Sequence, residues 1–79
     1  MKDTLHANGT LGSENYLMEI KTTNHTVMVD EPESIGGSDQ HPNPAQYVLS
    51  ALASCTAITI KMYADNKGWD VGNINVDVK

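Results

Sequence analysis

Two short segments in the first half of the chain have the residue pattern of β-strands, which place alternate side chains on opposite faces. The segment 16–21 predicts a strand, with Tyr16, Met18 and Ile20 on one face. Glu19 and Lys21 lie on the other face, beside Leu17. The segment 26–29, Thr-Val-Met-Val, again consists of residues typical of strands. A second strand is therefore expected there, joined to the first by a hairpin.

Turn-forming residues mark two further segments. The Asn-Gly pair at positions 8–9 is a common turn sequence, so we expect it to close a short hairpin. The segment 30–42 contains two prolines and the Gly36-Gly37 pair, which predicts a loop. Its acidic residues Asp30, Glu31 and Glu33 are expected to be solvated, because Pro32 and their irregular spacing suit no metal ion.

A long helix is the clearest element of the pattern. Asn43 is a favourable residue before the first helical turn, and Pro44 costs nothing at the first helical position. Gly68 is a typical residue just after a helix, and Lys67 places a cation at the negative end of the helix dipole. These residues predict a helix from Pro44 to Lys67.

This helix is apolar on all sides. No charged residue lies between Pro44 and Ile60, and small or apolar side chains surround the axis: Tyr47, Val48, Leu49, Ala51, Leu52, Ala53, Ala57, Ile58 and Ile60. A helix of this kind is usually buried all round. A few short strands cover only one side of it, so we expect a second copy of the chain, further C-terminal structure, or both to cover the rest.

A membrane span is the competing interpretation of the helix. A span needs about twenty consecutive, predominantly apolar residues. The uncharged run here is shorter and contains five polar side chains: Gln46, Ser50, Ser54, Thr56 and Thr59. We therefore expect no association with a membrane.

The last residues predict another strand. Ile74, Val76 and Val78 alternate with polar residues up to Lys79, and Trp69 is expected to pack back after the helix. Because the chain stops inside a regular strand pattern, we expect one domain, residues 1–79, that lacks its C-terminal part.

Composition restricts the possible functions. The net charge is −5 and all five basic residues are lysines, so the basic footprint that nucleic-acid binding requires is missing. The N-terminal residues contain no apolar segment of a signal peptide, which predicts a cytoplasmic protein. The single cysteine is then expected to stay a free thiol. His6, His25 and His41 lack metal-ligand spacing, so neither a metal nor a cofactor is expected. A core this small also favours a homo-oligomer.

Several of these segments together resemble the OsmC/Ohr family, and more narrowly its OsmC-like branch. The resemblance covers about residues 16–79 and is carried by Val29-Asp30-Glu31-Pro32, Gly36-Gly37, Pro42-Asn43-Pro44, Ala51-Leu52-Ala53-Ser54-Cys55-Thr56-Ala57-Ile58-Thr59-Ile60-Lys61-Met62-Tyr63-Ala64 and Lys67-Gly68-Trp69. It implies an α+β fold with an antiparallel sheet and a long buried central helix, assembled as an intertwined homodimer. The chain would represent the N-terminal portion of such a domain.

The resemblance also implies a chemistry. Many family members reduce organic hydroperoxides in the oxidative stress response with two cysteines and a thiol reductant. Cys55 matches the first cysteine, whereas the second cysteine and the arginine that the family pairs with a glutamate have no counterpart here. Ala45 stands where the family has that glutamate, and Gln46 follows it.

The candidate site residues are thus Cys55 as catalytic thiol, with Gln46 and His41 as binding residues. Each also has a simpler interpretation: an inert packed cysteine, a solvated first-turn glutamine and a loop histidine. Lys61 lies about 240° around the helix from Cys55, so it points elsewhere. Two functions follow: a thiol-dependent hydroperoxide reductase that is impaired in this chain, or a non-catalytic dimer that binds a small apolar ligand at its helix-lined interface.

Overall fold

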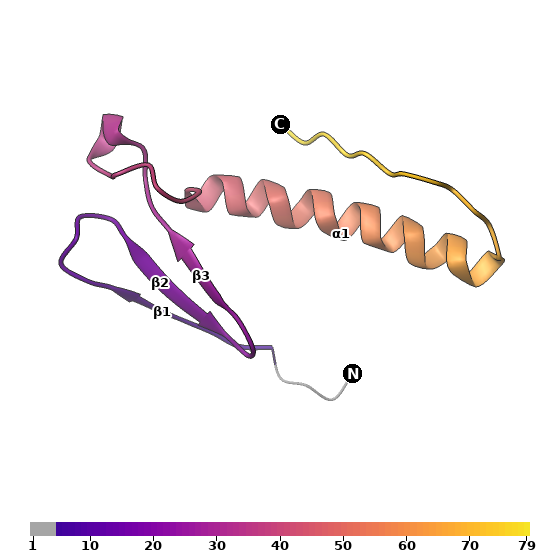
Figure 1. Ribbon diagram of the computed structural model, residues 1–79, viewed down its shortest axis with the longest axis horizontal. Coiled ribbons are helices and arrows are strands. Elements are labelled where there is room, and N and C mark those ends of the chain that lie inside the picture. The colour runs from indigo at the N-terminus through magenta and orange to yellow at the C-terminus, as the bar shows by residue number, and fades with distance from the viewer. Residues whose placement is uncertain (1–4) are drawn as a thin grey trace. The chain divides into compact units, whose positions relative to one another are not determined.

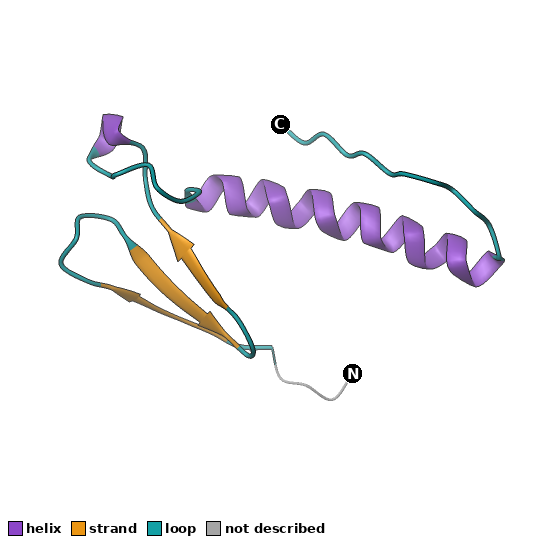
Figure 2. Ribbon diagram, viewed as in Figure 1, coloured by secondary structure: helices purple, strands orange, loops and turns teal. Residues whose placement is uncertain are grey.

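The computed structural model describes residues 5–79 of the chain. Residues 1–4 lie outside the described residues. They are the first part of the N-terminal segment in which no signal peptide is expected. The chain forms two compact units: the first ends at Pro44, and the second comprises Ala45–Lys79. The first unit contains the strands and the second contains nearly all of the long helix, as Figures 1 and 2 show. The architecture is therefore α+β, as the sequence predicts.

The first unit is a three-stranded antiparallel sheet in the order β1-β2-β3. Its strands are β1 (Ala7–Leu11), β2 (Met18–Thr22) and β3 (Thr26–Val29). The predicted strand 26–29 is confirmed residue for residue, and the strand predicted at 16–21 forms slightly later in the chain. The hairpin between them is confirmed as well, because Ile20 pairs with Val27 across it.

The turn predicted at Asn8-Gly9 is wrong, because both residues lie inside β1. Gly9 pairs with Ile20 in the register, and a Cβ on Gly9 would come within 2.7 Å of the Met18 methyl group. Glycine is used here for close packing between strands, not for a turn. The chain reverses instead between β1 and β2, where Asn15 adopts a left-handed conformation with φ 50°.

The register gives the sheet one apolar face. Leu11, Met18 and Val29 are aligned across the three strands, with Ile20 and Val27 on the same side. Only Val29 among them is fully buried, at 7% exposure. Met18, Ile20 and Val27 are half-buried, and Leu11 is exposed by 55%.

The second unit is built on helix α1 (Pro44–Lys67), whose predicted bounds are confirmed. Gly68 follows in the left-handed conformation, φ 72°, and its N–H donates to the Asp65 carbonyl at 3.1 Å. The Trp69 N–H donates to the Ala64 carbonyl at 2.8 Å. These bonds satisfy carbonyl groups that a helix end otherwise leaves without partners.

Trp69 packs back on the helix, as expected. Its ring meets the Tyr63 ring edge-to-face, with 5.9 Å between centroids, and the Lys67 ammonium lies 5.5 Å from the Tyr63 centroid. Aromatic and cation–π contacts of this kind stabilise an exposed helix end modestly.

The strand predicted at 74–78 does not form in this structure. Apart from a turn at Gly72, whose φ is 66°, residues 69–79 are extended. They pair with no strand, and they run back along α1 (Figures 1 and 2). Ile74, Val76 and Val78 are half-buried while their neighbours are exposed. The alternation was thus identified correctly, but an extended segment becomes a strand only where a second strand offers its backbone groups.

In the single chain α1 is exposed almost everywhere. Within the second unit only Ala64 is buried, at 2% exposure. By length and composition α1 could cross a bilayer, since its most apolar window has a mean hydropathy of 1.3. The core helix of a soluble protein satisfies the same criterion, so this property alone selects neither environment.

Candidate functional site

Cys55 lies at the middle of α1, with an exposed and unpaired thiol. The hydroxyl groups on either side are engaged with the helix backbone: Ser54 Oγ donates to the Ala51 carbonyl at 3.1 Å and Thr56 Oγ1 donates to the Leu52 carbonyl at 2.8 Å. The two residues that flank Cys55 in sequence thus direct their hydroxyl groups to the helix backbone.

An apolar stripe surrounds this thiol. We define the stripe as Val48, Leu52, Ile58 and Met62, which lie seven and three residues before Cys55 and three and seven after it. These spacings place all four side chains on the face of Cys55. They are exposed by 67%, 54%, 53% and 63%, respectively. The cysteine is therefore centred on an exposed apolar stripe.

Gln46 and Cys55 share a helix but not a face. Gln46 lies in the first turn of α1 and is exposed. Nine residues separate it from Cys55, about 13.5 Å along the axis and half a turn around it. A single copy of the helix therefore does not bring the two side chains together, and a binding role for Gln46 stays a prediction.

His41 belongs to the first unit and is half-buried in the loop that precedes α1. The central residue of that loop is Asp30, one of the carboxylates that were expected to be solvated. That interpretation of Asp30 is wrong, because its side chain is only 2% exposed.

Backbone N–H groups explain why a carboxylate is buried there. Glu31 N donates to Asp30 Oδ1 at 2.7 Å, and Ser38 N and Gln40 N donate to Asp30 Oδ2 at longer distances of 3.3 and 3.5 Å. Asp30 N in turn donates to the Pro42 carbonyl at 3.1 Å. We call this arrangement the Asp30 anchor. The aspartate next to a Pro- and Gly-containing loop was the signal for it, since Asp commonly bonds to backbone groups of its own turn.

The Asp30 anchor makes the stability of the first unit depend on pH. The N–H of Glu31 lowers the pKa of Asp30 below its ordinary value of 3.8; burial opposes this, and the N–H groups of Ser38 and Gln40 and the charge of His41 add to it. A depressed folded-state pKa contributes stability above the unfolded pKa, and this is lost as pH falls through the folded value. Wild type is thus expected to lose stability below pH 3.8.

Urea unfolding of wild type and Asp30→Asn between pH 7 and pH 2 measures this effect. At pH 7 the variant should unfold at a lower urea concentration than wild type. The difference between their unfolding midpoints should disappear below pH 3.8. Glu33→Gln, which removes an exposed carboxylate of the same loop, is the control and should follow wild type. A difference in unfolding midpoint that stays constant down to pH 2 would contradict the stabilising role of the Asp30 anchor.

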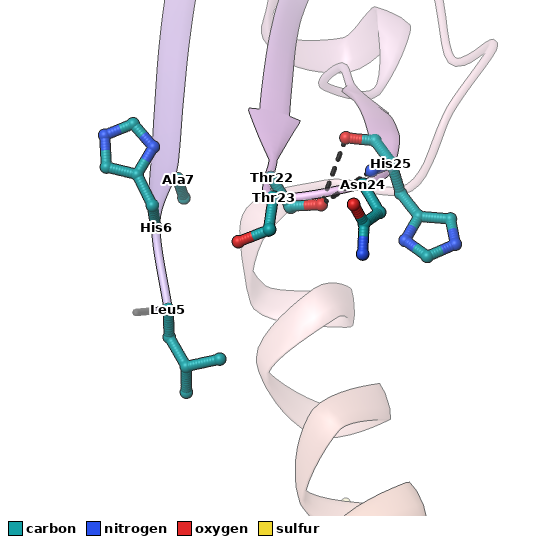
Figure 3. A pocket seen from close by; sticks show the side chains of 7 residues that line it. All are labelled: Leu5, His6, Ala7, Thr22, Thr23, Asn24 and His25. Carbon is teal, nitrogen blue, oxygen red and sulfur yellow. Dashed lines mark hydrogen bonds between the residues drawn. The ribbon is translucent and has the colours of Figure 1, made fainter. Parts of the chain in front are cut away.

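A separate cavity of about 450 Å³ lies at one end of the sheet, between the start of β1 and the β2–β3 turn. The turn is closed by Thr22: its Oγ1 donates to the His25 carbonyl at 3.1 Å and accepts from His25 N at 3.0 Å. Figure 3 shows the imidazole rings of His6 and His25 on opposite sides of the lining residues, so they do not converge on one ligand. Within residues 5–79, no cluster of three or more His, Cys, Asp or Glu side chains is placed to hold a metal ion.

Comparison with known proteins adds one finding. The sequence model of the family described as OsmC-like protein matches residues 37–79, which is more than half of the chain. The match includes all of α1 and Cys55, and it begins later than the resemblance noted from residue 16. Neither the curated proteins nor the solved structures contain a match to the chain.

Proposed function

The chain belongs to the OsmC-like family, and from that premise we propose that it is a thiol-dependent reductase of organic hydroperoxides. The observation that carries the proposal is the position of Cys55. It is the only cysteine of the chain, it lies inside the segment that matches the family, and its thiol is exposed on α1. Peroxide reduction and stress protection are the activities linked to this family.

The proposed reaction begins with the Cys55 thiolate. Its sulfur attacks the terminal oxygen of the hydroperoxide, the O–O bond breaks, and the departing alkoxide takes up a proton to leave as an alcohol. Cys55 is oxidised to a sulfenic acid. A thiol of the reductant then forms a mixed disulfide with Cys55 and releases water, and a second thiol restores the Cys55 thiol.

The printed sequence contains no second cysteine that would resolve the sulfenic acid. For residues 1–79 we propose that the resolving thiol comes from an external reductant or from Cys55 of a second copy. We propose that turnover by this chain is impaired relative to family members that use two cysteines, and that its rate rises with the concentration of the reductant.

The first step is tested on the reduced protein without turnover. After one equivalent of an organic hydroperoxide, a reagent selective for sulfenic acids should label the peptide that contains Cys55, as read by mass spectrometry. An excess of dithiol added before the reagent should remove the label. If no label is found at any of the times sampled after peroxide addition, Cys55 is not the peroxidatic residue.

We further propose an intertwined homodimer in which the partner covers α1. The exposed stripe supports this, because a soluble protein rarely leaves such a surface in water. The unpaired extended segment 69–79 also supports it, since its backbone groups need a neighbouring strand.

A charge inserted into the stripe tests the dimer. Sedimentation velocity of wild type should show a dimer, and Leu52→Glu should raise the dissociation constant about 100-fold or more, because a buried unpaired carboxylate is costly. Gln46→Glu adds the same charge about half a turn away from the stripe and should remain dimeric. A wild-type monomer at all concentrations would refute the proposal.

A non-catalytic role is the second candidate, and one feature favours it. An open groove of about 480 Å³ runs between α1 and the extended segment, lined mainly by Ala57, Ile58, Met62 and Ile74. Such a surface suits a small apolar ligand. The two functions are separated by a turnover assay, since a binding protein leaves hydroperoxide and reductant unconsumed.

A further inference from the structure

We draw no further inference here: the strongest candidate, the open apolar groove between α1 and the extended segment 72–74 with Lys61 at its rim, carries nothing because no observation shows what covers it and the Lys61 ammonium is already paired with the Asp65 carboxylate at 2.6 Å.

Discussion

Replacing Cys55 with serine is expected to reduce the thiol-dependent consumption of an organic hydroperoxide to the rate of the reductant alone. Serine keeps the shape of the side chain and replaces the sulfur with a hydroxyl group. At neutral pH the hydroxyl stays protonated and does not attack the O–O bond, whereas a thiolate does. The whole effect of the substitution should therefore appear in turnover.

The measurement is peroxide loss with a dithiol reductant, for wild type and Cys55→Ser at equal concentration. Ser54→Ala is the matched control, because it changes the adjacent residue, whose hydroxyl bonds only to the Ala51 carbonyl, and it should retain wild-type turnover. Circular dichroism of each variant shows whether α1 is intact. Equal rates for wild type and Cys55→Ser would reject the reductase and favour the ligand-binding role.

Gly37→Ala is expected to lower the free energy of unfolding of the first unit by about 2–3 kcal/mol. A Cβ on Gly37 would clash with the carbonyl oxygen and the carbonyl carbon of Glu31. Both are backbone atoms, so no side chain can rotate to make room. The loop has to open, which breaks the bonds from Gly37 N to the Pro32 carbonyl and from Asp39 N to the Glu31 carbonyl, each 3.0 Å long.

Gly12→Ala is the control for this prediction. No atom lies within 4 Å of the Cβ that it adds, and its effect on stability should be within about 0.5 kcal/mol. Urea unfolding followed by circular dichroism compares the two variants with wild type, and amide exchange at Asp39 reports the loop directly. The contrary outcome is that Gly37→Ala unfolds at the same urea concentration as wild type while the Asp39 amide stays protected from exchange. In that case the close approach of Gly37 to Glu31 is not a feature of the folded protein.

Sequence alone determined the elements whose signals are local. The strand at 26–29 and the helix from Pro44 to Lys67 depend on residue preferences and on the Asn-Pro start and Gly68 stop, all of which act within a few residues. The resemblance located Cys55 on that helix. The Asn8-Gly9 turn failed because the same pair also suits a strand in which glycine admits a close neighbour, and only the Met18 side chain across the sheet decides between them.

The features that only the tertiary structure decided depend on partners distant in sequence. Asp30 belongs to an acidic stretch in the sequence, yet the N–H groups of Ser38 and Gln40, eight and ten residues away, make it a buried anchor. The alternation at 74–78 is fully visible in the sequence, but it needs a second backbone to become a strand. A residue's own preferences define a helix or strand, whereas burial, pairing and charge stabilisation depend on which groups the fold brings within bonding distance.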